Sequence, residues 1–386
     1  MIDAGRAPGL YVHIPYCAKI CPYCDFAVTR GNRDKQRAFV AALLAELELI
    51  PDWHGQFDTL YFGGGTPSIL APEELGQVIA AVRGRFDCSE QLRITIEANP
   101  EDATAAKLEA WRQLGTAGIS FGIQSFSDPE LRFLGRQHTP QTAKDAVTAA
   151  LSAGFEWVSV DLIYGLPKQT LAEWHDSLAV AVSLRPHHIS CYQLTIHEGT
   201  PFFRREARGQ LQQLTDAALG DFFRATHDTL AHAGYRAYEV SNFARSDSDR
   251  SPHNQKYWNH TPYLGIGPSA HSFDGRKRWW NERDASSYQQ RVGAGQRPIA
   301  DQEQLNASQL ALEAAMLALR TSDGIDCARY QQTHGVDLEA LNAALFDELR
   351  RSGLLETKAG RLSLTTNGLA VVDGITPRLV LHEQES

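Results

Sequence analysis

Three cysteines lie close together near the start of the chain, in the stretch "CAKICPYCDF" at 17–26. Cys17, Cys21 and Cys24 follow the spacing C-x3-C-x2-C. Thiolates are soft ligands that suit zinc or iron–sulfur clusters. A closed structural zinc site takes four ligands, and His13 would be the fourth here. Three thiolates alone fit a 4Fe-4S cluster whose fourth iron stays open for another molecule, and we favour this interpretation.

The other cysteines, Cys88, Cys191 and Cys327, are scattered along the chain. The N-terminus has no basic segment followed by an apolar stretch, so we expect no secretory signal and no disulfide framework. Isolated free cysteines are commonly buried as small hydrophobic residues. We therefore expect none of the three to bind the cluster.

The composition is that of an ordinary globular protein. The chain has 386 residues, of which 43% are hydrophobic and 22% charged. No apolar run approaches the roughly 20 residues needed to cross a bilayer. A net charge of −9 argues against nonspecific nucleic-acid binding, although "GRKRWW" at 275–280 is locally basic. We expect a cytoplasmic protein whose membrane contacts, if any, are peripheral and made through partners.

The first 200 residues alternate β-rich runs with helical patterns. Strand–helix alternation implies a parallel sheet. Six such units are too few for a closed eight-stranded barrel, so we predict an α/β fold built on a partial (β/α)6 barrel. The expected strands are 10–15, 59–64, 93–98, 118–123, 157–165 and 188–196, and clear helices are expected at 34–50, 72–86 and 170–184.

Each predicted strand ends in polar or glycine-rich residues. In barrel-like α/β folds the active site lies at the C-terminal ends of the strands. We therefore expect these residues to face one pocket, although each alone would also suit a solvated or capping position. They are Cys17, Gly63 to Gly65, Glu97, Gln124, Asp161 and Gln193.

The strand–helix alternation fades after about residue 210. A helix is expected at about 214–233, then a loop rich in Ser, Asp and Arg, and helices again from about 303. The last helices surround a strand-like "GRLSL", which suggests a small winged-helix-like module. Its mixed charges favour packing over nucleic-acid binding. The predicted domains are 1–210, a barrel core; 211–300, an α+β region that completes the barrel; and 301–386, the C-terminal module.

The cysteine motif, with Tyr23 before its last cysteine, resembles the radical S-adenosylmethionine (SAM) family. In that family the open iron is chelated by the amino and carboxylate groups of SAM, and reduction cleaves SAM to a 5′-deoxyadenosyl radical. The six-unit partial barrel is also the family's fold. The resemblance therefore implies two cofactors, a 4Fe-4S cluster on the three cysteines and SAM.

The resemblance also implies a set of SAM-binding residues. "YFGGGTPS" at 61–68 corresponds to the glycine stretch that binds the methionyl end of SAM, and glycines allow a close approach of the backbone. A carboxylate such as Glu97 would accept hydrogen bonds from ribose hydroxyls or the SAM ammonium. Charged groups in such a pocket should be paired. The implied set is Tyr11, Tyr23, Gly64, Gly65, Thr66, Glu97, Gln124, Arg136 and Asp161.

One branch of the family matches most closely. The motifs "YVHIPYC", "ISFGIQSF", "LGRQHT" and "VDLIYGLPKQT" resemble those of oxygen-independent coproporphyrinogen III dehydrogenase and of HemW-type heme chaperones, over about 9–375. The dehydrogenase has a further cysteine two residues past the third ligand, where this chain has Phe26. It also has an N-terminal extension ahead of its first strand. Both differences favour the chaperone branch, and a radical SAM oxidoreductase of tetrapyrroles is the alternative.

"HNQKYW" at 253–258 matches the H-N-x-x-Y-W motif of the chaperone branch through His253, Asn254, Tyr257 and Trp258. Imidazole is the common axial ligand of heme iron, and aromatic rings stack on a porphyrin. We expect His253 to bind heme.

The nearest competitors as heme ligands are His260 and His271, whereas His138, His188 and His197 are expected to be structural or to line the pocket. The resemblance implies transfer of heme to heme-requiring, notably respiratory, enzymes and a monomer–homodimer equilibrium. It leaves open whether SAM is cleaved.

Overall fold

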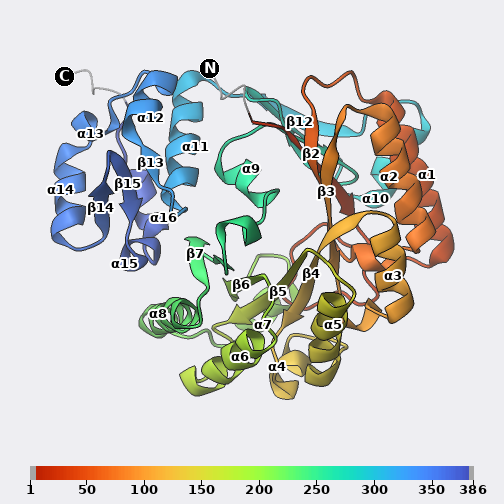
Figure 1. Ribbon diagram of the computed structural model, residues 1–386, viewed down its shortest axis with the longest axis horizontal. Helices are drawn as coiled ribbons and strands as arrows, with labels where there is room; N and C mark the ends of the chain where they lie inside the picture. The colour runs from red at the N-terminus through yellow and green to blue at the C-terminus, as the bar shows by residue number, and fades with distance from the viewer. Residues whose placement is uncertain (1–5, 382–386) are drawn as a thin grey trace.

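The computed structural model describes residues 6–381; residues 1–5 and 382–386, the outer ends of the first and last predicted domains, lie outside this range. Six parallel strands pair side by side in chain order and curve into an open barrel (Figure 1). The predicted partial barrel is therefore confirmed. The strands are β1 (Gly9–Ile14), β2 (Phe57–Gly64), β3 (Cys88–Ala98), β4 (Thr116–Gln124), β5 (Trp157–Tyr164) and β6 (His188–Gln193).

Helices cover the outer face of these strands. Local signals fix where they begin: the Asn32 side chain caps α1, and Thr170 with Glu173 forms a capping box on α6. Large apolar side chains such as Phe39 and Trp174 are fully buried between helices and sheet. The covering helices are α1 (Arg33–Leu49), α2 (Pro72–Arg85), α3 (Ala105–Gln113), α5 (Pro140–Ser152) and α6 (Leu171–Ser183). The short helices α4 (Asp128–Phe133) and α7 (Pro201–Ala207) pack against each other through Phe133 and Phe202, and the Phe202 amide donates to the Pro22 oxygen of the cysteine loop.

The sheet is larger than the sequence predicts, with twelve strands among the described residues. β7 (Arg236–Glu239) and β8 (Asn242–Ala244) follow α8 (Asp216–His232) and extend the sheet antiparallel beyond β6. At the other edge β9 (Tyr263–Ile266) pairs parallel with β1. The antiparallel strands β10 (His271–Phe273), β11 (Lys277–Asn281) and β12 (Ile299–Gln304) follow, with α10 (Ala285–Gly293) between the last two.

The prediction missed these six additional strands because they are three to six residues long and lack alternating hydrophobicity. The predicted end of the sixth strand was also wrong. β6 stops at Gln193, and residues 194–196 are not part of the sheet.

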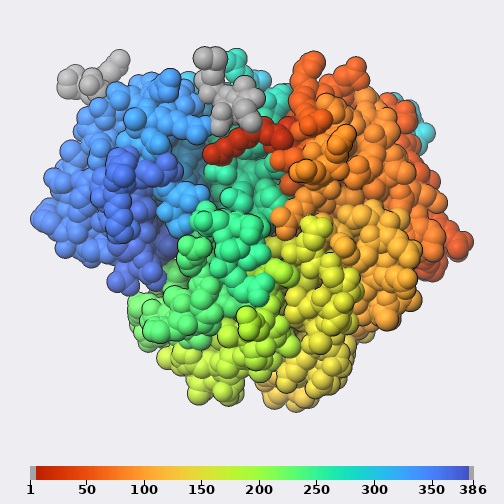
Figure 2. Space-filling model, in the orientation of Figure 1, coloured from red at the N-terminus to blue at the C-terminus, as the bar shows by residue number. Residues whose placement is uncertain are grey.

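The C-terminal residues form a separate lobe with its own hydrophobic core, drawn in blue in Figures 1 and 2. α11 (Ala307–Leu319) contacts α9 (Asn254–Trp258) of the preceding region. The designation of this lobe as a winged helix, and the domain boundaries at 210 and 300, stay predictions. Its other elements are β13 (Ile325–Asp326), α12 (Cys327–His334), α13 (Leu338–Leu341), α14 (Ala343–Arg351), β14 (Leu355–Lys358), β15 (Arg361–Leu364), α15 (Thr366–Leu369) and α16 (Val372–Ile375).

Within residues 6–381, the helices are too short or too polar to cross a membrane.

Candidate functional site

The three clustered cysteines line one cavity of about 420 Å³ at the C-terminal ends of the barrel strands. Thr66 Oγ1 donates a hydrogen bond to Cys17 Sγ at 3.4 Å, and Arg136 Nη1 lies 3.7 Å from Cys21 Sγ. A Cβ on Gly65 would lie 3.0 Å from Cys17 Sγ and 2.9 Å from a backbone oxygen of β1. Glycine is therefore required where the loop after β2 meets the cysteine loop.

The sulfur atoms sit in an environment that favours metal-bound thiolates. Burial raises the pKa of the Cys17 thiol, and it raises that of Cys24 to about 11. Both thiols are thus neutral at pH 7 unless a positive centre binds them, which is what an iron cluster supplies. Arg136 provides the nearest cation. The donor set fits a cluster held by three cysteines.

His13 holds the cysteine loop in place. Its Nε2 is 3.0 Å from the Ala27 oxygen and its Nδ1 is 3.1 Å from the Tyr11 hydroxyl. Both ring nitrogens therefore have protein partners, and neither is free to be the fourth ligand of a zinc ion. No three His, Cys, Asp or Glu side chains of the described residues converge on a single-ion site.

Eight of the nine predicted SAM residues line the same cavity as the cysteines. Arg136 is anchored at its centre, because Nη2 donates to Asn99 Oδ1 and to the Gly122 oxygen, both at 2.6 Å. Its Nε is buried without a hydrogen-bond partner in the described part of the chain. The eight are Tyr23, Gly64, Gly65, Thr66, Glu97, Gln124, Arg136 and Asp161.

Two carboxyl groups, those of Glu97 and Asp161, line this cavity. Glu97 accepts hydrogen bonds from the Tyr61 hydroxyl at 3.0 Å and the Gly64 amide at 3.2 Å. Burial, and then the charge of Asp161, raise the pKa of Glu97 to about 7. Burial raises the pKa of Asp161 to about 6. Two carboxyl groups held this way favour a cationic ligand, which would lower both pKa values.

The structure shows where three more of the predicted residues, Gln124, Asp161 and Tyr11, lie relative to the strands and cavities. Gln124 ends β4 with a φ of 71°, so its side chain leaves the strand at a backbone turn. Asp161 was expected at the end of its strand, but it lies in the middle of β5, because that strand runs on to Tyr164. Tyr11 lies deeper, on the wall of a second, inner cavity.

The inner cavity has a volume of about 210 Å³ and lies behind Glu97 and Asp161. Three residues of the HNxxYW motif, His253, Asn254 and Tyr257, line it. Trp258 does not, and it packs against Tyr238 instead.

His253 is fully engaged with its neighbours. Its Nδ1 lies 3.0 Å from Thr59 Oγ1, its Nε2 lies 2.9 Å from the Tyr257 hydroxyl, and its ring stacks on Tyr61 at 5.0 Å. Burial, and then the charge of Lys256, lower its pKa to about 3. The side chain is therefore a neutral imidazole with both nitrogens hydrogen-bonded.

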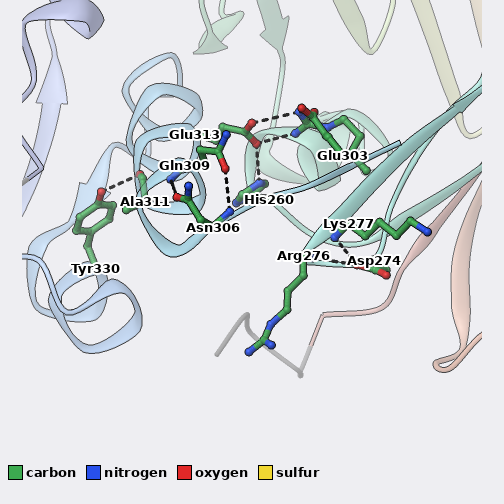
Figure 3. Close-up of polar contacts among 11 residues, drawn as sticks. His260, Asp274, Arg276, Lys277, Glu303, Asn306, Gln309, Ala311, Glu313 and Tyr330 are labelled. Atoms are coloured by element: carbon green, nitrogen blue, oxygen red, sulfur yellow. Dashed lines mark hydrogen bonds and ion pairs between the residues drawn. The ribbon is translucent and has the colours of Figure 1, made fainter. Parts of the chain in front are cut away.

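The two competing histidines differ sharply. His260 Nε2 bonds Glu313 of α11 at 3.1 Å (Figure 3), and its ring stacks on Phe273. His271 is exposed and stacks on Trp280 at 5.5 Å. It lines a third cavity, of about 370 Å³, that opens beside the cysteine loop.

Of the remaining histidines, His138 and His188 are buried with both ring nitrogens within 3.3 Å of protein partners, and His188 also lines the inner cavity. His197 lines the cavity of the three cysteines, and its Nδ1 lies 3.4 Å from Asp25 Oδ2.

Sequence reasoning missed several cavity residues. Asn99, which accepts a hydrogen bond from Arg136, comes two residues after Glu97. Its position just past the end of a predicted strand was the signal that could have identified it. Tyr61 and Ser120 point into the barrel from within β2 and β4. The alternation of side chains along a strand was the signal for them, but in strands buried on both faces polar residues are not confined to one face.

Comparison with known proteins places the chain in a family. Residues 11–181 match the model of the radical SAM superfamily, and 305–371 match that of the HemN C-terminal domain. The heme chaperone HemW of Mycobacterium tuberculosis is 34% identical, over 97% of this chain and 95% of the relative. That of Bacillus subtilis is 30% identical, over 93% and 95%.

A bovine relative, the mitochondrial radical S-adenosyl methionine domain-containing protein 1, is 33% identical over 98% of this chain and 90% of its own. The structure of the radical SAM enzyme coproporphyrinogen III oxidase (HemN) from Escherichia coli superposes with a TM-score of 0.81, covering 96% of this chain and 89% of that one. Its 23% identity supports the shared fold alone. By sequence over nearly its whole length, the chain belongs to the HemW family of the radical SAM superfamily.

Proposed function

We propose that this protein is a heme chaperone, which binds heme and passes it to heme-requiring enzymes. The observation that carries this proposal is the match to the M. tuberculosis heme chaperone over 97% of the chain. Phe26 supports it, because the sequence has no cysteine at the position where the related dehydrogenase carries one.

We propose that Cys17, Cys21 and Cys24 hold a 4Fe-4S cluster and that SAM binds beside it. When bound, the cluster and SAM would supply one-electron chemistry at the sulfonium. The protein would hold the SAM cation over the carboxylates of Glu97 and Asp161. The other residues proposed for SAM are Tyr11, Tyr23, Gly64, Gly65, Thr66, Gln124 and Arg136.

For heme, the motif residues His253, Asn254, Tyr257 and Trp258 are the proposed binding set. The geometry adds a condition. His253 Nε2 is held by the Tyr257 hydroxyl, so His253 would ligate iron only after this hydrogen bond breaks. Respiratory acceptors, a homodimer and a cytoplasmic location stay predictions.

A titration of the anaerobically reconstituted protein with heme tests the function. We expect saturable binding of about one heme per chain, followed by transfer to an apo-enzyme that becomes active. Coproporphyrinogen III should be left unchanged under reducing conditions with SAM. Formation of protoporphyrinogen IX, or no saturable heme binding, would replace the chaperone by the oxidoreductase alternative.

A further inference from the structure

We propose that heme is captured in the exposed cavity beside the cysteine loop, with His271 as an iron ligand. The cavity, called here the entry chamber, is the 370 Å³ space that His271 lines. This inference rests on the proposed heme binding and names where the heme sits and what holds it.

The entry chamber has the size and position of a ligand site. Its volume falls in the range of roughly 300–1,000 Å³ typical of small-molecule pockets. It is bounded by β1, the cysteine loop, α9 and the β9–β10 turn. A further cavity of about 420 Å³ shares Phe26, Ala27 and Arg283 with it, which leaves room for a large flat molecule across Phe26.

His271 has the state that metal ligation requires. Its ring is exposed, and neither ring nitrogen has a hydrogen-bond partner within residues 6–381. Partial burial against the protein, and then the charge of Arg278, lower the pKa of His271. The imidazole is therefore neutral at pH 7 and has a lone pair to donate. Stacking on Trp280 fixes the orientation of the ring.

Two more groups suit a porphyrin with carboxylate side chains. Phe26 is 62% exposed, although an aromatic side chain of this size gains by burial. It lines the entry chamber, the cavity next to it and the cluster cavity. Arg283, on the same wall, donates to the Asp25 backbone oxygen, which positions its guanidinium to pair with a propionate.

Tyr257 separates the entry chamber from His253. Tyr11, Glu97 and Tyr257 line both the entry chamber and the inner cavity. Two imidazoles line the entry chamber, His13 and His271, and both ring nitrogens of His13 already have protein partners. His271 is therefore the one with nitrogens open to a ligand, whereas the Nε2 of His253 lies behind the Tyr257 hydroxyl. A heme in the chamber would therefore meet His271 first, and His253 only if Tyr257 turns away.

The test compares heme binding by wild-type protein, His271→Ala and His54→Ala, all with reconstituted cluster. His54 is an exposed histidine that lines none of these cavities and serves as the control. We measure the heme dissociation constant and the electron paramagnetic resonance spectrum of the ferric heme. For His271→Ala we expect about tenfold weaker binding, an altered ligand signature, and recovery of the signature on adding free imidazole.

Each outcome is decisive. If the wild type binds heme and His271→Ala matches His54→Ala in affinity and spectrum, the entry-chamber ligand is refuted while the chaperone function stands. If the wild type binds no heme, both proposals fail. Should His271→Ala lose its cluster or its folding, His271→Gln replaces it, since it keeps the size and polarity of the side chain but removes the imidazole ligand.

Discussion

The cavity that the three cysteines line, called here the outer cavity, and the inner cavity behind it both carry charged and aromatic side chains, yet they differ in how those side chains are paired. In the inner cavity His253 and His188 have every ring nitrogen hydrogen-bonded. In the outer cavity Arg136 Nε has no hydrogen-bond partner among the described residues, and burial raises the pKa of the Cys17 and Cys24 thiols. Complete pairing marks a wall that holds its shape, and incomplete pairing marks a surface that awaits a ligand.

Among the substitutions considered, removal of a cysteine should have the largest effect, and it acts on the outer cavity. Cys24→Ala leaves two thiolates for a cluster that needs three, so we expect nearly complete loss of iron from the reconstituted protein. Iron analysis measures it. Cys88→Ala is the matched control, because Cys88 begins β3 and does not line the outer cavity. Retention of full iron by Cys24→Ala would assign the cluster to other residues.

Replacing Arg136 should come next. Arg136→Met removes the hydrogen bonds to Asn99 and Gly122 and also the positive charge beside Cys21, so the wall of the outer cavity loses its anchored cation. We expect SAM affinity, measured by calorimetry on cluster-loaded protein, to fall about thirtyfold. The exposed Arg132→Met is the control. Unchanged affinity in Arg136→Met would mean that this side chain only braces the loop.

SAM affinity should depend on pH through Glu97. The pKa of this carboxyl group is about 7, so its ionised fraction, which the SAM cation prefers, grows as the pH rises from 6 to 8. We expect about tenfold tighter binding at pH 8 than at pH 6. In Glu97→Gln this dependence should shrink to about twofold, which is the part left to Asp161 with its pKa of about 6. A wild-type affinity that is flat with pH would contradict the assignment.

The same raised pKa affects stability with a definite sign. The folded state keeps the Glu97 proton to a higher pH than the unfolded chain does. The stabilisation of the folded state by this protonated group is therefore fully present below a pH of about 4.3 and is lost as the pH rises through about 7. SAM-free protein should therefore show less loss of stability over this window when Glu97 is replaced by Gln. Urea unfolding at the two ends of the window measures the difference.

Replacement of His253 tests whether the hydrogen bonds in the wall of the inner cavity stabilise the protein. His253→Ala leaves Thr59 and Tyr257 unpaired, so we expect the free energy of unfolding to fall by about 1–3 kcal/mol even without heme. Tyr257→Phe removes one of these two bonds and should cost about 1 kcal/mol. If His253→Ala is as stable as wild type, the hydrogen bonds of His253 do not stabilise the wall of the inner cavity, and our interpretation of this wall is wrong.

The smallest effect should come from the contact with the C-terminal lobe. Glu313 of α11 accepts from His260 and from Arg278, with its nearest Arg278 contact at 2.6 Å, and these hydrogen bonds lower its pKa to about 2 despite burial (Figure 3). Glu313→Gln should cost about 1 kcal/mol or less, since the group is partly exposed. Thermal melting at low and high salt measures it, with the smaller difference from wild type expected at high salt.

The fold was predictable where the pattern repeats. Six strand–helix units predict a parallel sheet, because parallel neighbours need a crossover connection, which is usually a helix. The short strands β8 and β10 escaped prediction because three residues carry no periodicity, and their pairing depends on the strands beside them. Asp161 lines the pocket as expected, but it does so from the middle of β5 and not from the end of that strand, which is Tyr164.

The sequence by itself determined the cysteine spacing, the glycines beside it and the order of polar residues along the strands, because these follow from residue types at fixed separations. Only the tertiary structure decided which histidines are free. His253, His260 and His271 are equivalent as imidazoles in the sequence. Contacts with Thr59, Glu313 and Trp280, each from a different element of the fold, commit two of them to hydrogen bonds and leave His271 open to a ligand.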